Sequence, residues 1–169
     1  MFKIRKFKMV SNKEIKKCLG ENSTWADERY REGFILRFKP RRATKYSAAY
    51  DLYSPIDIKL KSGEIAKIPS CFKIKMPKNE AFFIYIRSSY GAKDINLPAG
   101  VNIIDSDYYN NPDNEGNFYI IIKNNSNKTF TINAGDRIAQ GVFQRYYKTV
   151  DDFSRAKRKS GLGSTGKNG

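Results

Sequence analysis

The chain has no histidine in its 169 residues and only two cysteines, Cys18 and Cys71. Without histidine, Ser-His-Asp and Cys-His nucleophilic sites are excluded, as are zinc sites that use imidazole. Two thiols are too few for a four-thiolate site or a disulfide framework, so the cytoplasm is the expected compartment. A catalytic base would therefore be a carboxylate, and a metal would be a hard cation held by oxygen atoms.

Long apolar runs are also lacking, and acidic residues are few. No run approaches the roughly 20 residues that span a bilayer, and the basic, alternating segment Met1–Val10 is not expected to act as a secretory signal. Lys and Arg number 32 against 17 Asp and Glu, a formal net charge of +15. That charge predicts an anionic partner without choosing between a nucleotide, a nucleic acid and a membrane surface.

What is present is a β pattern. From Arg41 onward, short runs rich in Ile, Val, Phe and Tyr alternate with turn residues. Such spacing without repeats predicts an all-β fold, a jelly-roll-like β-barrel over residues 41–153, followed by a flexible glycine-rich arm over 154–169. The expected strands are Pro55–Leu60, Ile65–Ile68, Phe72–Met76, Ala81–Arg87, Phe118–Lys123, Thr129–Ile132 and Ile138–Tyr147.

Residues 1–40 are expected to add a strand and short helices that pack on the barrel. The segment Ser11–Glu14 has the form of a capping box and predicts a helix through Cys18 that stops at Gly20. A second helix is expected from Thr24 to a point before Gly33. A structural role is favoured here, and a nucleic-acid or protein-docking role stays open because of the basic residues Lys3, Arg5, Lys6, Lys8, Lys13, Lys16 and Lys17.

Two polar side chains stand among apolar neighbours. Asp51 lies in Ala48–Ser54, which on its own is more typical of a turn at a strand edge. Gln140 lies in the middle of an expected strand in Gly135–Phe143. A buried glutamine must find hydrogen-bond partners, either in the core or on a ligand.

The segment Arg87–Lys93 places a guanidinium, two hydroxyls and a glycine at the exit of a strand. It could form an anion cradle. The alternative is the capped start of a helix, with Ser88 or Ser89 at the N-cap. The two possibilities overlap, because a helix N-terminus would itself bind phosphate.

The best candidate for a reaction centre is Gly100–Tyr108. An apolar run delivers Asp105 at a strand end, where burial can change its pKa. Asp107 would point to the same face in an extended chain, so the two carboxylates could supply a base and an orienting group or bind Mg²⁺. The alternative is an Asx-type turn.

The segment Gly161–Gly169 is rich in glycine and hydroxyls and follows the basic stretch Arg155–Lys159. Backbone N–H groups, hydroxyls and guanidinium groups bind polyphosphates. The segment matches G-x-x-x-x-G-K, but Asn168 stands where a P-loop has Ser or Thr, so a P-loop is not expected. On this segment alone, a solvated terminus is favoured.

Taken in order, these segments resemble the motifs of the trimeric deoxyuridine triphosphatase (dUTPase) family. The resemblance runs from about Arg41 onward, and Asp105–Tyr108 and Gly135–Gln140 are its most specific parts. It implies a jelly-roll homotrimer with shared active sites that hydrolyses dUTP to dUMP and pyrophosphate with Mg²⁺, limiting uracil incorporation into DNA and supplying dUMP. From first to fifth, the matching segments are Ala48–Ser54, Arg87–Lys93, Gly100–Tyr108, Gly135–Phe143 and Arg158–Gly166.

The resemblance assigns roles by position. Asp105 would activate the water that attacks the α-phosphorus, Tyr108 would stack beneath the deoxyribose, and Asp51 would act near Mg²⁺ through water. Uracil would be recognised by a β-hairpin, through the backbone of Asn102, Ile103 and Ile104. The phosphates and the closing arm would use Arg87, Ser88, Ser89, Gly91, Gln140, Arg158, Leu162, Gly163, Ser164 and Thr165.

Several positions depart from the family pattern. Ala49 replaces a glycine of the first motif, Asn102 stands where many members have glycine, and Leu162 replaces the aromatic residue that stacks on uracil. An active enzyme with weaker or less selective arm closure is therefore expected. Two alternatives stay open: a dCTP deaminase-like enzyme, and a regulatory or binding protein on a dUTPase scaffold. A nucleotide is favoured over a nucleic acid as partner, and no membrane partner is expected.

Overall fold

The computed structural model describes residues 5–155, 157–158 and 160. Its helices are α1 (Asn12–Leu19), η1 (Thr24–Ala26), η2 (Glu28–Tyr30), α2 (Arg31–Phe38), α3 (Ser88–Gly91) and η3 (Ser106–Tyr108). Its strands are β1 (Lys6–Met9), β2 (Tyr50–Tyr53), β3 (Ile58–Leu60), β4 (Ile65–Pro69), β5 (Phe72–Lys75), β6 (Glu80–Ile86), β7 (Ile95–Asn96), β8 (Asn102–Asp105), β9 (Tyr119–Asn124), β10 (Phe130–Ile132) and β11 (Arg137–Arg145).

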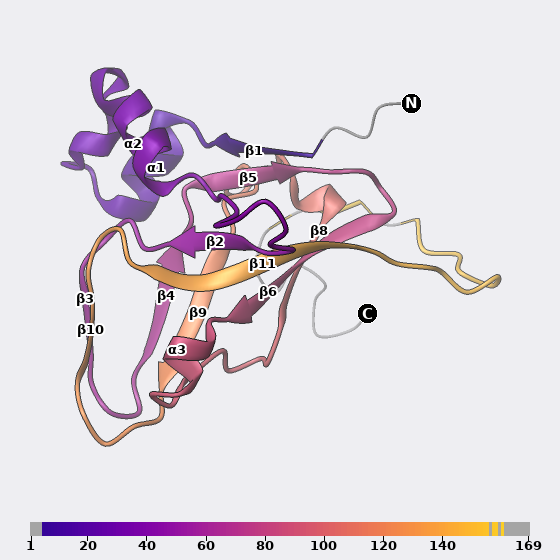
Figure 1. Cartoon of the computed structure of the whole chain (residues 1–169). Coiled ribbons are helices and arrows are strands. Elements are labelled where there is room, and N and C mark those ends of the chain that lie inside the picture. The colour runs from indigo at the N-terminus through magenta and orange to yellow at the C-terminus, as the bar shows by residue number, and fades with distance from the viewer. Residues whose placement is uncertain (1–4, 156, 159, 161–169) are drawn as a thin grey trace.

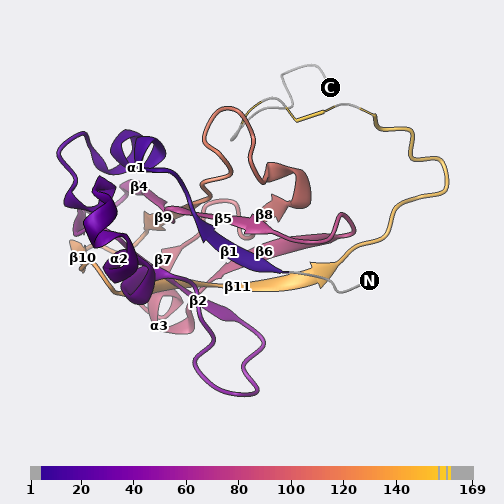
Figure 2. The ribbon, with the colours of Figure 1, turned by 90° about the horizontal axis from the view of Figure 1, so that it is seen from above.

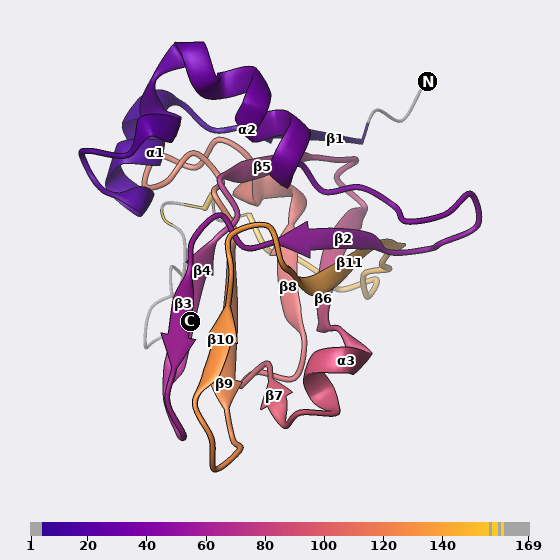
Figure 3. The same cartoon turned by 60° about the vertical axis from the view of Figure 1, so that its left-hand side comes forward.

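The strands form antiparallel sheets around one core (Figures 1 and 3). The larger sheet has the order β2-β11-β6-β8, and the smaller one has the order β4-β9-β7. Two ribbons, β1-β5 and β3-β10, complete the structure. The prediction of a jelly-roll-like β fold with short helices is confirmed. No helix in the described part of the chain is long and apolar enough to cross a membrane.

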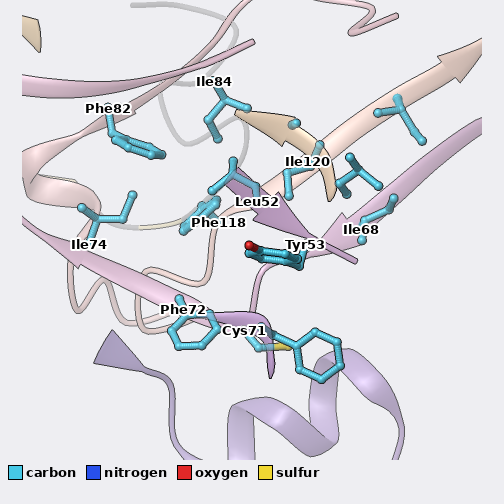
Figure 4. Packing of buried hydrophobic residues seen from close by; sticks show 14 of the residues in the cluster. Leu52, Tyr53, Ile68, Cys71, Phe72, Ile74, Phe82, Ile84, Phe118 and Ile120 are labelled. Carbon is cyan, nitrogen blue, oxygen red and sulfur yellow. The ribbon is translucent and has the colours of Figure 1, made fainter. Parts of the chain in front are cut away.

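The core is built from inward-facing side chains of both sheets (Figure 4). Phe82, Phe118 and Ile120 are completely buried within it. Gly141 on β11 is required for this packing, because a Cβ there would lie 2.0 Å from the Phe82 ring. Strand β11 can therefore lie close against β6, and this pair positions the polar residues described below.

The N-terminal helices cover one end of the barrel (Figure 1). Ser11 caps α1 as predicted, since its hydroxyl accepts from the Glu14 N–H at 3.3 Å. A capping box would also have the Glu14 carboxylate accept from the Ser11 N–H, and this part of the prediction is wrong. Glu14 is buried and accepts from Asn117 Nδ2 at 3.0 Å, whereas the Ser11 N–H donates to Glu115. A contact with the barrel has replaced the local one.

Most predicted strand ends differ from the structure by one or two residues, and two boundaries differ by more. Helix α2 continues through Gly33 to Phe38, because the residue that stops it is Pro40, which disfavours helical backbone in the residue before it. The strand predicted from Pro55 begins at Ile58. The Ser54 hydroxyl donates to the Ile56 carbonyl at 2.6 Å, and this turn delays the strand.

Candidate functional site

Strand β8 places Asp105 at the edge of the larger sheet. In the described part of the sheet, β8 pairs with β6 and with no other strand. It therefore forms no β-hairpin with an adjacent segment of the chain, and its other edge is open. Ile103 on this strand is 55% exposed. The chain then turns into η3, so the extended backbone predicted between Asp105 and Asp107 is wrong.

Arg158 nevertheless joins these two carboxylates. Its guanidinium donates to Asp105 at 2.5 Å and to Asp107 at 2.8 Å, and its Cζ lies 5.5 Å from the centre of the Tyr108 ring. Figure 2 shows the chain leaving β11 in a wide loop and returning toward this side of the barrel. Burial raises the pKa of Asp105, and the positive charge of Arg158 offsets only part of that rise.

Buried asparagines hold Tyr108. The Tyr108 hydroxyl accepts from Asn114 Nδ2 at 2.9 Å and donates to the Asn117 carbonyl at 3.3 Å. Asn114 and Asn117 were not recognised from the sequence, where this segment looks like an ordinary polar loop.

We call Asp105, Asp107, Tyr108 and the open edge of β8 the acidic half-site.

A second group of residues lies where β2, β6 and β11 meet. Asp51 is 9% exposed, and its carboxylate lies 3.3 Å from Arg137 Nη1 and 3.5 Å from Arg87 Nε. These residues line a hollow of about 370 Å³ together with Gln140 and Ser88. We call Asp51, Arg87, Ser88, Arg137 and Gln140 the cationic half-site.

The serines of this region are not helix caps. The N-cap of α3 is Arg87, which makes no side-chain cap bond, and Ser88 and Ser89 lie inside the helix with their side chains exposed. No hydrogen bond to either hydroxyl is found among the described residues. Gly91 follows them and leaves open space, since a Cβ there would meet only Ile86 at 3.9 Å. These groups are therefore available to a ligand.

Arg137 belongs to the cationic half-site, although its sequence position did not predict this. Regular alternation along β11 would place Arg137 and Gln140 on opposite faces of the sheet. A register shift between Arg137 and Ala139 interrupts that alternation, and both side chains line the same hollow. A β-bulge redirects a side chain in this way.

A larger hollow adjoins the cationic half-site. It measures about 580 Å³, shares Arg87 and Arg137 with the first hollow, and adds Arg41 and Lys93. Asp136 is its acidic lining residue. The surplus of cations suits an extended anion such as a polyphosphate chain.

The donor set for a metal ion is small. Asp51 is the carboxylate that lines the smaller hollow. In the described residues there is no cluster of three or more His, Cys, Asp or Glu side chains that could hold a metal. This set fits a Mg²⁺ ion bound mainly by waters and substrate phosphates, which is the usual manner of Mg²⁺ binding.

The two half-sites are far apart within one chain. Asp105 lies opposite Ala81 near one end of β6. Gln140 lies opposite Tyr85 near the other end, and Asp51 lies opposite Gln140. At about 3.3 Å per residue along a strand and about 4.8 Å between strands, Asp105 and Asp51 are roughly 20 Å apart. One chain does not bring its acidic and cationic half-sites together.

The remaining predicted residues fall outside these two groups. Arg158 pairs with carboxylates in this structure, although the resemblance assigns it to phosphate. In the basic N-terminal segment, Arg5 pairs with the buried Glu80 and Lys17 with Asp113. Four residues assigned to the arm lie outside the described part of the chain: Leu162, Gly163, Ser164 and Thr165.

Comparison with known sequences gives consistent matches. The family model for dUTPase matches residues 39–166. The deoxyuridine 5'-triphosphate nucleotidohydrolase of Lactococcus lactis subsp. lactis is 38% identical over 130 residues, covering 75% of this chain and 87% of the relative. That of Variola virus is 39% identical over 132 residues, covering 75% of this chain and 84% of the relative.

Solved structures agree with this result. The dUTPase from Streptococcus mutans is 36% identical, with a TM-score of 0.62, covering 65% of this chain and 87% of that one. The dUTPase of Staphylococcus bacteriophage 80alpha, at 20% identity and a TM-score of 0.61, covers 90% of this chain and 99% of that one, and supports the fold alone. Since the matched region carries both half-sites and most of the chain, this protein belongs to the dUTPase family.

Proposed function

We propose that this protein hydrolyses dUTP to dUMP and pyrophosphate in active sites shared between subunits of a homotrimer. The observation that carries the proposal is the division of the site. One chain presents a carboxylate half-site and a cationic half-site on the same sheet, roughly 20 Å apart by strand register. A nucleotide that needs both must be bound between two chains.

The cationic half-site would bind the phosphates. Arg87 and Arg137 provide fixed guanidinium groups, Gln140 provides an amide, and the exposed hydroxyls of Ser88 and Ser89 can donate. Charge-assisted hydrogen bonds to phosphate are stronger than neutral ones. Because Arg87 and Arg137 already line the hollow, their guanidinium groups can neutralise charge that develops on the leaving pyrophosphate.

Asp51 would hold Mg²⁺ on the phosphates through water. The ion would supply further positive charge to the phosphate oxygens. Asp51 lies between two guanidinium groups, with its carboxylate 3.5 Å from Arg87 Nε and 3.3 Å from Arg137 Nη1. It is thus suited to hold hydrated cationic charge close to the arginines that bind the anion.

Asp105 would be the general base. Its carboxylate would take a proton from a water molecule whose oxygen forms a bond to the α-phosphorus. The bond between that phosphorus and the oxygen bridging to the β-phosphate then breaks, and pyrophosphate leaves with the electron pair. Burial raises the pKa of Asp105 and so makes its carboxylate a stronger base than an ordinary aspartate.

The base and sugar would bind along the acidic half-site. The open edge of β8 offers backbone N–H and C=O groups that can pair with the polar edge of uracil, as strand edges do with added peptides. Tyr108 is fixed by Asn114 and Asn117, so its ring can support the deoxyribose. Arg158 covers that ring in this structure and would have to move when the sugar binds.

A substrate panel tests the proposal. Pyrophosphate release would be measured from dUTP, dCTP, dTTP and UTP, with and without Mg²⁺, in wild type and Asp105→Asn. We expect Mg²⁺-dependent release from dUTP above the other three, and loss of that release in the variant. Ammonia release from dCTP would instead support a deaminase. Nucleotide binding without turnover would support a regulatory protein on this scaffold.

We expect the enzyme to act in the cytoplasm, where free nucleotides are its substrates.

A further inference from the structure

The two cysteines, isolated in sequence, meet where the N-terminal helices contact the barrel. Cys18 lies in the last turn of α1, and Cys71 lies between β4 and β5 with a φ of 61°. Their sulfur atoms are 3.8 Å apart, and both thiols are free. Figure 4 shows Cys71 beside Phe72 at the edge of the core that faces the helices.

The backbone holds both sulfurs in place. The Cys71 N–H donates to Asn117 Oδ1 at 2.9 Å, and its carbonyl accepts from the Val10 N–H at 3.1 Å. Helix α1 is fixed to the same asparagine through Glu14 at 3.0 Å. A disulfide requires sulfurs about 2.05 Å apart, so the two sulfurs, now 3.8 Å apart, would have to approach by about 1.8 Å.

The two thiols differ in access. Cys71 is completely buried, whereas Cys18 is partly exposed and can be reached by a small oxidant. The hydrogen bond with Cys71 lowers the pKa of Cys18, and burial raises the pKa of Cys71. Cys18 is therefore the thiol that reacts first, and Cys71 is its resolving partner.

We propose that Cys18 and Cys71 form a reversible disulfide on exposure to a peroxide, joining the N-terminal helices to the barrel. The Cys18 thiolate attacks one peroxide oxygen and breaks the O–O bond, giving a sulfenic acid and, after protonation, water. The Cys71 sulfur then attacks the Cys18 sulfur, and the hydroxide that leaves takes the Cys71 proton to form a second water. The two thiols lose two electrons, and the peroxide gains them.

The bond would join a segment outside the matched family region to the family barrel. The dUTPase match begins at residue 39, whereas Cys18 lies in α1. Closing a loop of about 50 residues restricts the unfolded chain and stabilises the folded one. We expect the oxidised protein to unfold at a temperature about 5–15 °C higher than the reduced protein.

Peptide mapping tests this inference. The full chain would be treated with hydrogen peroxide, alkylated under denaturing conditions and digested with trypsin without reductant. We expect a linked pair of peptides containing Cys18 and Cys71, a whole-chain mass lower by two hydrogen atoms, and reversal by dithiothreitol. Cys18→Ser should show neither the link nor the rise in unfolding temperature. Sulfinic acid at Cys18, or a link between chains, with Cys71 still open to alkylation would overturn the proposal. Because no step measures turnover, its failure is separate from failure of the proposed hydrolysis.

Discussion

The two half-sites are built in different ways. In the cationic half-site, three neighbouring strands converge on Asp51, whose side chain is 12% exposed and paired with two guanidinium groups of its own chain. The acidic half-site lies at a sheet edge, where the side chain of Asp105 is 50% exposed and pairs with Arg158 from beyond the last strand. The cationic half-site is thus held by contacts among paired strands, whereas the acidic half-site also depends on a residue from beyond the last strand.

Removing the base should have the largest effect. We expect Asp105→Asn to lower kcat by about 10²–10⁴-fold, the usual contribution of a general base. Asp107→Asn is the matched control, because it removes the neighbouring carboxylate that also contacts Arg158. Steady-state pyrophosphate release checks both variants, and equal losses would show that Asp105 has no special role.

Arg137 tests the cationic side. We expect Arg137→Ala to raise KM for dUTP by about 10–100-fold, since a charge-assisted hydrogen bond contributes about 1.5–3 kcal/mol. Arg137→Lys should recover part of this loss by restoring charge without the planar fork. An unchanged KM in the alanine variant would remove Arg137 from the phosphate site.

The buried support of Tyr108 should matter less to the reaction and more to stability. Asn114→Ala removes the donor to the Tyr108 hydroxyl, and we expect the free energy of unfolding to fall by about 1–2 kcal/mol. Asn127→Ala, at an exposed position, should change it by less than about 0.5 kcal/mol. Denaturant titration measures both, and a neutral Asn114 variant would contradict the supporting role.

The smallest effect concerns pH. Asp105 must be ionised to act as a base, and burial raises its pKa, so kcat/KM should be lost on acidification at a higher pH than an ordinary aspartate would give. Arg158→Ala removes the opposing positive charge and should shift this acid limb further upward, by about one pH unit or less. An unshifted profile would mean that Arg158 does not contact Asp105 in the working enzyme.

Much of the fold could be predicted because local patterns and final structure agree. Alternation and turn residues located most of the barrel strands, but not β2 (Tyr50–Tyr53), whose segment was expected to form a turn at a strand edge. Ser11 and Gly20 mark the ends of α1. Predictions failed where a distant contact replaced a local one. Glu14 accepts a hydrogen bond from Asn117 instead of capping its own helix. Helix α2 runs through Gly33, where it was expected to have ended, and stops before Pro40.

The residues of the two half-sites could be predicted from the sequence only in part. Asp105 and Gln140 could be singled out, because a polar residue at the end of an apolar strand or within one is visible in the sequence. Arg137 could not, since a bulge changed the face on which it lies. The separation of the half-sites likewise depends on strand pairing between residues distant in the chain.

Mixing two variants, each first shown to be nearly inactive by itself at the dUTP concentration used, tests the shared site most directly. Asp105→Asn damages the acidic half-site, and Gln140→Ala damages the cationic one. If each site uses one half from each of two chains, co-expression in equal amounts should restore about a quarter of wild-type activity, because random assortment leaves that share of sites intact. No activity above that of the separate variants would contradict the account, since it would mean that both halves of each site come from one chain.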